Sequence, residues 1–285
     1  MAIQNFIPLI WSENLYKQLD KKYVGVANCN REWEGDIKQC GDRVRICGVG
    51  PVSVFNYTEN TDIPDPQVLS DSFRDLVINQ AKAFNFQIDD IDMAQSRPGL
   101  MDAAIRQAAD ALADAADKHI YNLHSQVNSE NNITVTDVNE NTIFSIILDA
   151  IVSLQTKGVR DDLILEVSPR IAAVILKAKL NLLSDNSAVV ENGYIGSIAG
   201  CKVYVSNNIC TRAEGDTLFA QCFLRTKRSI AFAEQLSEIE AYRPELRFAD
   251  AVKGLHLYGA KIVYPDEILL LSLCFEKTAT TQING

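Results

Sequence analysis

The sequence has 285 residues, of which 47% are hydrophobic and 22% are charged, and its formal net charge is −10. These values are typical of one large globular domain or two intertwined lobes, and they exclude a chain that is disordered along its length. The acidic balance argues against a protein that coats nucleic acid, because phosphate contacts require clustered Lys and Arg.

The cysteines and the N-terminal residues give no sign of export. The seven cysteines are an odd number and are widely spaced, and no Cys-x-x-Cys pair indicates a zinc knuckle or a thioredoxin-like site. Residues 1–11 lack the basic and apolar regions of a signal peptide. No run of about 18 apolar residues predicts a membrane span. We therefore expect a protein kept in a reducing cytoplasm, with its cysteines as buried thiols.

The first predicted element is an N-terminal arm over residues 1–32. Ser12 is a suitable N-cap for a short helix, and this helix carries Leu15, Tyr16 and Leu19 on one face. A short amphipathic helix is not stable by itself. The pattern therefore predicts a segment that buries its apolar side on a partner surface.

The next region, residues 33–92, has the alternation of β-strands. Apolar and polar residues alternate over 43–54 and again over 76–88, and a polar stretch with two prolines, 57–72, separates these two runs. We expect an extended β-hairpin and its base. A hairpin that projects alone is marginal in water, so the pattern also favours an oligomer.

A helical period replaces the alternation over residues 97–128. The apolar residues fall near one face, and the segment is rich in alanine, the best helix former. Pro98 and Gly99 mark its start. A helix of about 28 residues would be roughly 42 Å long. The sequence thus predicts a spine across the molecule.

Helices and strands alternate through the rest of the chain, which predicts a compact α/β lobe followed by two more strands. Pro169 suits the first turn of one of these helices. The pattern predicts helices at 141–155 and 170–180, strands at 163–167, 202–205, 217–224, 254–263 and 267–274, and a glycine-punctuated loop at 193–200. No internal repeat of 20–50 residues is present, which argues against a solenoid.

Three segments of this chain, in order, resemble the major capsid protein family of tailed bacteriophages, whose fold is of the Hong Kong ninety-seven type. The first is Phe86-Gln-Ile-Asp-Asp-Ile-Asp-Met-Ala-Gln95. The second is the alanine- and aspartate-rich spine over 101–121, and the third is the glycine-punctuated segment 193–208. The opening residues, 7–12, are also similar.

The resemblance implies an α+β phage major capsid fold with five parts. These parts are the N-terminal arm (1–32), an extended β-hairpin loop and its base (33–92), a peripheral domain with a long spine helix (93–135), an α/β axial domain (136–250), and the return strands of the peripheral domain with the C-terminus (251–285).

The resemblance also implies a function: a major capsid protein that assembles itself into the pentamers and hexamers of an icosahedral shell around double-stranded DNA. The hairpin would lie over a neighbouring subunit. An encapsulin-like compartment shell is the alternative, because encapsulins share the fold. The implied partners are further copies of the chain, a separate scaffolding protein, a portal, a decoration protein and DNA bound without sequence specificity. Assembly would take place in the host bacterial cytoplasm, away from membranes.

Two features of the family have no matching counterpart in this sequence. Some members carry a long helical scaffold segment that a protease removes. This sequence opens directly on the arm, which implies a separate scaffold, or an already processed or scaffold-independent form. Other members join subunits through Lys–Asn isopeptide bonds. Lys38 and Lys82 lie in the hairpin region, but neither matches that chemistry.

No residue is assigned a catalytic, cofactor-binding or metal-binding role. His119 and His124 are five residues apart, so they lie about 140° apart around a helix and do not form a metal-binding pair. The acidic cluster of Asp89, Asp90 and Asp92 could bind Mg²⁺ or share acid–base work, but such residues at a strand end usually cap backbone amides.

The glycines of 193–200 do not match a phosphate-binding loop. Gly193, Gly196 and Gly200 have the wrong spacing, and Ile195 stands where a nucleophile elbow around Ser197 would need glycine. A turn is the preferred interpretation. A cytosolic α/β enzyme remains the third hypothesis, but it lacks a convergent catalytic site and leaves the hairpin unexplained.

The densest basic group comprises Arg225, Lys227 and Arg228. It could face packaged DNA or form salt bridges between subunits, and the sequence does not separate these alternatives. Acidic residues that could pair with it are Asp161, Asp162, Glu166, Glu234, Glu238 and Glu240. Four aromatic residues are expected to pack in a core or an interface rather than to stack on bases: Phe84, Phe86, Tyr242 and Phe248.

Overall fold

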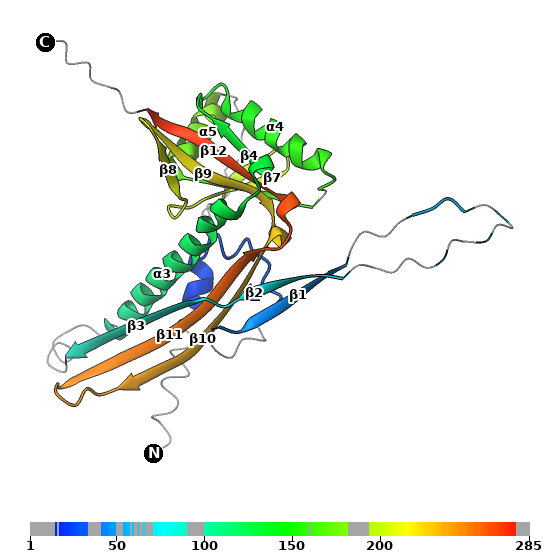
Figure 1. Cartoon of the computed structure of the whole chain (residues 1–285). Coiled ribbons are helices and arrows are strands. Elements are labelled where there is room, and N and C mark those ends of the chain that lie inside the picture. Colours follow the sequence, from blue (N-terminus) through cyan, green and yellow to red (C-terminus); the bar gives the residue numbers. More distant parts are fainter. Residues whose placement is uncertain are drawn as a thin grey trace, which may run out of the picture.

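A computed structural model shows a mixed α/β chain with two β-sheets of different size, joined by one long helix (Figure 1). A two-stranded ribbon projects to one side of this body (Figure 1). The structure describes residues 15, 17–33, 41–49, 54–57, 59, 62, 65, 71–89, 100–159, 161–181 and 194–277.

The helices are α3 (Leu100–Tyr121), α4 (Ile143–Thr156) and α5 (Pro169–Asn181), with a short helix over 17–22 before them. The strands are β1 (Arg43–Val49), β2 (Asp71–Val77), β3 (Gln80–Asp89), β4 (Asn132–Val135), β5 (Leu163–Val167), β6 (Tyr194–Ile198), β7 (Cys201–Val205), β8 (Thr211–Glu214), β9 (Thr217–Thr226), β10 (Ile230–Tyr242), β11 (Ala249–Ile262) and β12 (Ile268–Lys277).

The seven-stranded sheet has the order β4-β12-β9-β5-β7-β6, with β8 paired to β9 outside this path. The β5–β7 and β4–β12 pairs are parallel, and the other pairs are antiparallel. Side chains on β12 show how its two faces are covered. Leu269, Leu271 and Leu273 enter the core beneath α4 and α5, whereas Ile268 and Leu270 enter the core around α3.

The three-stranded sheet has the order β10-β11-β3 and is antiparallel throughout. Its strands also alternate between two cores. Phe232 and Tyr258 pack in the core of α3, whereas Ala233 and Leu257 pack with the base of the β1–β2 ribbon. The molecule is therefore layered. Helix α3 packs between the two sheets, α4 and α5 cover the other face of the seven-stranded sheet, and the base of the ribbon covers the other face of the three-stranded sheet.

Helix α3 confirms the predicted spine but is shorter than expected. Its 22 residues correspond to roughly 33 Å. The helix ends at Tyr121, and the 3₁₀-helix η1 (Asn122–Gln126) follows it. Here a ring nitrogen of His124 lies 2.9 Å from the carbonyl oxygen of Tyr121, and the Ser125 hydroxyl donates to the carbonyl of Asn122. These side chains satisfy terminal carbonyls that a continuing helix would otherwise satisfy.

Most other predicted elements are present within one or two residues of their expected ends. The expected loop at 193–200 is an exception, because residues 194–198 form β6 and only Ala199 and Gly200 form the turn to β7. Both turn residues have positive φ, +49° and +82°, as a two-residue type I′ hairpin requires. Glycine spacing therefore marks a hairpin rather than a loop.

The expected hairpin is also only partly correct. β1 pairs antiparallel with β2, from Arg43 opposite Val77 to Val49 opposite Asp71, so the returning strand begins at 71 and not at the expected 76. The later part of the second alternating run forms β3, which pairs with β11 instead of β1. The change of partner occurs at residues 78–79, where the backbone of Val77 and Ile78 passes directly over Gly259 of β11.

The pairing of two strands does not follow the expected boundary at residue 250. β10 was not predicted, and although it lies within 136–250 it pairs with β11 in the three-stranded sheet. β12 lies within 251–285, the expected return strands of the peripheral domain, but it pairs with β9 and β4 in the seven-stranded sheet. Sequence order therefore does not separate the sheets at residue 250, because β9–β10 and β11–β12 both cross between them.

Gly259 gives a test of the contact between ribbon and sheet. A Cβ at this position would lie 2.3 Å from the carbonyl oxygen of Val77, whereas a Cβ at Gly254 would meet the ring of Phe84, which can rotate. We expect Gly259→Ala to lower the free energy of unfolding by about 1–3 kcal/mol, and Gly254→Ala by less. Urea unfolding of both variants measures this difference, and equal losses would contradict the backbone contact.

Candidate functional site at the junction of the two sheets and on the projecting ribbon

Arg225 of β9 lies at the centre of the molecule and is fully buried. Its Nε and Nη2 donate to the two carboxylate oxygens of Glu166 on β5, at 2.9 and 3.0 Å. Nη1 donates to the carbonyl of Asn28 at 2.6 Å, and Nη2 also donates to the carbonyl of Gly25 at 3.1 Å. Arg225 is therefore not part of a surface basic group as the sequence suggested. It ties the N-terminal segment to the seven-stranded sheet.

Asp117 of α3 holds the same segment from the other side. Its carboxylate accepts the backbone N–H groups of Val24 and Val26, both at 3.0 Å. Burial raises the pKa of Asp117 to about 6, although hydrogen bonds from the backbone N–H groups of the segment act in the opposite direction. The turn over 23–29 is thus fixed both to the spine helix and to the sheet.

Glu234 of β10 extends this anchorage to the three-stranded sheet. Its carboxylate accepts the Tyr23 hydroxyl at 2.5 Å and Nη2 of Arg31 at 2.7 Å. Nε2 of His256, on β11, lies 2.8 Å from the same carboxylate. Burial, followed by the charge of Glu234, raises the pKa of Tyr23 well above its ordinary value, so the phenol remains a donor. Residues 17–33 therefore join both sheets.

A third polar cluster lies where the chain crosses between the sheets. The 3₁₀-helix η3 (Lys227–Ser229) connects β9 to β10, and η4 (Pro265–Glu267) connects β11 to β12. Glu267 accepts the Thr226 hydroxyl at 2.6 Å and two bonds from Arg228, at 2.8 and 2.5 Å. Arg228 also pairs with Asp161 at 2.9 Å. The remaining basic residue, Lys227, lines a shallow pocket with Arg31 and Glu32.

Of the acidic residues expected to pair with this basic group, Glu166 pairs with Arg225 and Asp161 pairs with Arg228. Besides the pairs already described, Asp162 binds Lys202 at 3.2 Å and Glu240 binds Lys253 at 2.7 Å. These ion pairs form within one chain. Glu166, Glu234 and Glu267 are almost fully buried, and for Glu166 and Glu234 a single acid directly after an apolar run was the signal in the sequence.

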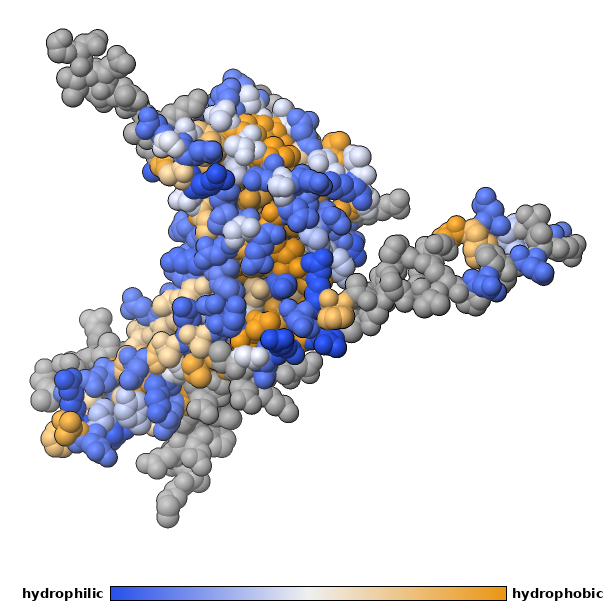
Figure 2. Space-filling view, viewed as in Figure 1, coloured by the Kyte–Doolittle hydropathy of each residue, from blue (hydrophilic) through white to orange (hydrophobic). Residues whose placement is uncertain are grey.

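The projecting ribbon consists of β1, β2 and the described residues between them, and it exposes large apolar side chains. Val54, Phe55, Tyr57 and Phe73 are 95, 51, 68 and 57% exposed. Figure 2 shows this apolar surface on the ribbon beside hydrophilic atoms. Residues 46–73 contain four carboxylates and no Lys or Arg. The base of the ribbon is firmly held by a core that includes Val44, Ile46, Leu76 and Ile78.

Two further apolar groups are exposed on the body. Leu246 and Phe248, in the turn between β10 and β11, are 96 and 84% exposed. Leu148 and Val152 on α4 and Leu176 on α5 are also exposed, and Figure 2 shows apolar surface on this lobe. Large apolar residues gathered at projecting ends are typical of interaction surfaces. The exposed surface is therefore suited to contacts with other chains.

The structure describes His119, His124 and Asp89 among the residues singled out from the sequence. The His119 ring packs on Tyr258, with centroids 5.6 Å apart, and Asp89 ends β3. Asp90 and Asp92 lie outside the described residues. Within the described part of the chain, no three His, Cys, Asp or Glu residues are grouped so that they could hold a metal ion. None of the described helices is long and apolar enough to cross a membrane.

The four selected aromatic residues have different environments. Phe84 and Phe86 stack on each other, with centroids 6.0 Å apart, and pack against the core of α3 as expected. The hydroxyl of Tyr242 donates to Asn85 at 3.1 Å. Phe248 packs in no core and is exposed.

The fold is that of phage major capsid proteins of the Hong Kong ninety-seven type. A structure from Mycobacterium phage Che8 is 26% identical, covers 87% of this chain and 90% of its own, and has a TM-score of 0.63. The capsid of Ralstonia phage GP4 is 12% identical, with 91 and 90% coverage and a TM-score of 0.67. The resemblance to phage major capsid proteins is thereby confirmed, and so is a chain of mixed helices and strands.

Shells other than phage capsids are also similar to this chain. The SrpI encapsulin complex of Synechococcus elongatus is 10% identical, covers 84% of each chain and has a TM-score of 0.57. No protein-family model matches the sequence, and no curated protein matches it. The chain therefore has a shell-forming fold that is found mostly in phage capsids.

The pair of Arg225 and Glu166 predicts a strong energetic coupling. We expect Glu166→Leu alone to cost about 3–5 kcal/mol of unfolding free energy, because it leaves a buried guanidinium without its counter-charge. Adding Arg225→Met should recover part of this loss. Urea unfolding of both single variants and the double variant measures the coupling, and the exposed Lys202–Asp162 pair, with a coupling below about 1 kcal/mol, is the control. Additive losses would contradict the buried pair.

Asp117 predicts a pH dependence of stability. Because its pKa is raised to about 6, the folded state binds this proton more tightly than the unfolded chain does. The contribution is fully present below the ordinary carboxyl pKa near pH 4 and is lost as the pH rises through about 6. Relative to Asp117→Asn, the wild type should therefore lose up to about 3 kcal/mol between pH 4 and pH 7. Parallel stability curves for the two proteins would show that Asp117 does not titrate in this way.

Proposed function

We propose that this chain is the major capsid protein of a tailed bacteriophage, which assembles into pentamers and hexamers of an icosahedral shell around double-stranded DNA. One observation carries the proposal: the projecting ribbon exposes Val54, Phe55 and Tyr57 far from any core of their own chain. A structure of this kind becomes stable when its apolar side chains lie on a neighbouring subunit.

The layered structure supports an assignment of the parts. We assign the seven-stranded sheet with α4 and α5 to the axial domain, near the centre of each capsomer. The three-stranded sheet and α3 form the peripheral domain. β10 then belongs to the peripheral domain and β12 to the axial domain, since each follows its sheet rather than the boundary at residue 250.

The chemistry of the surface also suits a shell protein. The net charge is −10, and Arg225 and Arg228 are held by carboxylates of their own chain. Contacts with packaged DNA are therefore weak and without sequence specificity. The chain has a structural role and catalyses no reaction. A scaffolding protein, a portal and a decoration protein are its further partners, and assembly takes place in the host bacterial cytoplasm, away from membranes.

An encapsulin-like compartment shell is the second candidate, and the similarity to the Synechococcus elongatus encapsulin complex supports it. The phage function is favoured because the similar structures are mostly phage capsids. It is also favoured because the Che8 structure is 26% identical to this chain, whereas the encapsulin is 10% identical.

Electron microscopy of the purified chain, expressed alone and then with a candidate scaffold, tests the proposal. Closed polyhedral particles, or rings of five and six subunits, are expected. A monodisperse monomer or dimer under both conditions would contradict a shell protein. Nucleic acid packaged in particles from infected cells would distinguish a virus from a compartment, which would contain protein cargo.

The ribbon gives a more specific prediction. Replacing residues 54–72 by a short Gly–Ser linker removes the exposed Val54, Phe55 and Tyr57 and keeps the base around Val44 and Leu76. We expect a soluble, folded subunit that forms no closed particles. Circular dichroism checks the fold and electron microscopy checks assembly. Normal particles from this variant would show that the ribbon does not link neighbours.

A further inference from the structure

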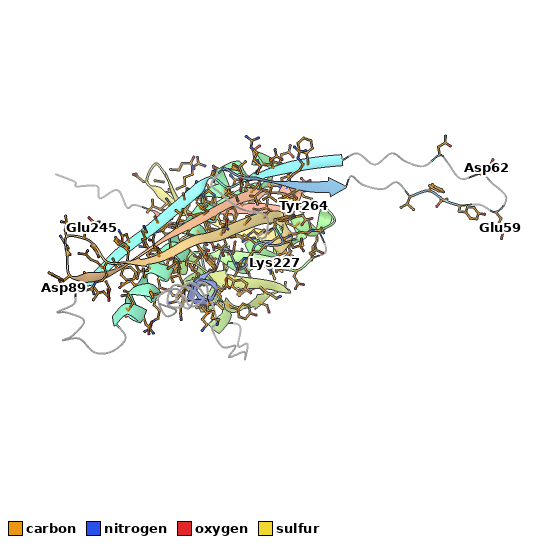
Figure 3. All side chains as sticks on the ribbon, turned by 90° about the horizontal axis from the view of Figure 1, so that it is seen from below. Glu59, Asp62, Asp89, Lys227, Glu245 and Tyr264 are labelled. Carbon is orange, nitrogen blue, oxygen red and sulfur yellow. The ribbon has the colours of Figure 1, made fainter. Side chains whose placement is uncertain are left out.

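The two strand crossovers between the sheets lie side by side. The backbone N–H groups of Val263 and Tyr264 both donate to the carbonyl of Ser229, at 2.8 and 3.2 Å. The first crossover leaves β9 through η3, and the second enters β12 through η4. Figure 3 shows Lys227 and Tyr264 midway between the labelled ends of the elongated molecule. Any rotation of one sheet against the other must therefore change the backbone here.

One carboxylate joins these crossovers. Glu267, at the end of the second crossover, is only 8% exposed. It accepts a hydrogen bond from the hydroxyl of Thr226, at the end of β9, and a bidentate pair of hydrogen bonds from Arg228 in the first crossover. A planar guanidinium bound through two nitrogens has a defined orientation, which a flexible ammonium would not give.

Arg228 has two further contacts that fix its position. It pairs with Asp161, just before β5, and its guanidinium lies 5.4 Å from the ring centroid of Tyr264. Its side chain is 52% exposed, so its ion pairs contribute little to stability. Such a set of contacts can select one conformation of the two crossovers among several of similar energy.

We propose that Arg228 is a positioning residue that sets the angle between the two sheets and thereby the size of the shell. This inference rests on the proposed function. In a shell built from repeated head-to-tail contacts, the rotation between copies decides whether the assembly closes and after how many copies. In the proposed shell the axial and peripheral domains contact different neighbours, so the angle between the two sheets of one subunit enters every such rotation.

Arg228 can be tested because it is separate from the buried anchorage. Loss of Arg225 would leave Glu166 buried without its partner, so such variants report on folding. Arg228→Met, in contrast, removes a half-exposed side chain, and Glu267 keeps the Thr226 hydroxyl. We expect Arg228→Met to fold as the wild type does.

The experiment compares particles of the wild type, Arg228→Met, Arg228→Lys and Arg212→Met by cryo-electron microscopy. Arg212 is the matched control, because its pair with Glu214 is long, at 3.9 Å, exposed, and confined to the β8–β9 hairpin. We expect at least a twofold broader spread of particle diameters for Arg228→Met. Arg228→Lys should be intermediate, and Arg212→Met should match the wild type.

Small-angle X-ray scattering of the dispersed subunits gives a second measure that needs no particles. Arg228→Met should show a broader distribution of interatomic distances than the wild type and Arg212→Met. Wild-type diameters, or wild-type scattering where no variant assembles, would overturn the inference. Failure of the wild type and the control to assemble would count against the proposed function alone. If Arg228→Met does not fold, Glu267→Gln, which keeps the side-chain shape, provides the same comparison.

Discussion

The buried ion pair of Arg225 and Glu166 determines where the parts of the molecule meet. A guanidinium without water must satisfy all its N–H groups, and Glu166 accepts only some of them. The others bind the carbonyls of Gly25 and Asn28, which fixes the path of the N-terminal segment across the sheet. That path brings Tyr23 to Glu234, so the anchorage of the second sheet depends on the first.

The elements that the sequence predicted best are those whose signals are local. β5 has its predicted bounds because an apolar run is bounded by polar residues, and α5 begins at Pro169, which favours a first helical turn. The alanine-rich spine and the alternation of β1 are equally local. The family resemblance supplied the overall fold, since no local pattern specifies how sheets are arranged.

What the sequence did not predict depends on distant partners. β10 carries the buried Glu234, which is paired with Tyr23, Arg31 and His256. Because a charged residue occupies a buried position, the apolar–polar alternation of this strand is not visible in the sequence. Arg225 and Arg228 look alike in the sequence, yet one is fully buried and the other half-exposed. The sheet assignment of β12 likewise follows from its pairing with β9, a partner about 50 residues earlier in the chain.

The exposed apolar residues of the ribbon and of the β10–β11 turn lie at different ends of the molecule. Figure 3 shows Glu59 and Asp62 at one end of the molecule and Asp89 and Glu245 at the other. The apolar residues of the ribbon and those of the β10–β11 turn therefore lie at opposite ends. A contact that joins unlike ends is heterologous and can propagate around a ring, which a self-complementary dimer contact cannot do.

The buried thiols have a consequence for how the protein responds to oxidants. Burial raises the pKa of Cys29, Cys201 and Cys222 to about 12, so these thiols are protonated at neutral pH. The thiolate is the species that oxidants attack. The thiols of Cys29, Cys201 and Cys222 therefore resist oxidation in aerated water, because the packed interior of the folded chain keeps them protonated.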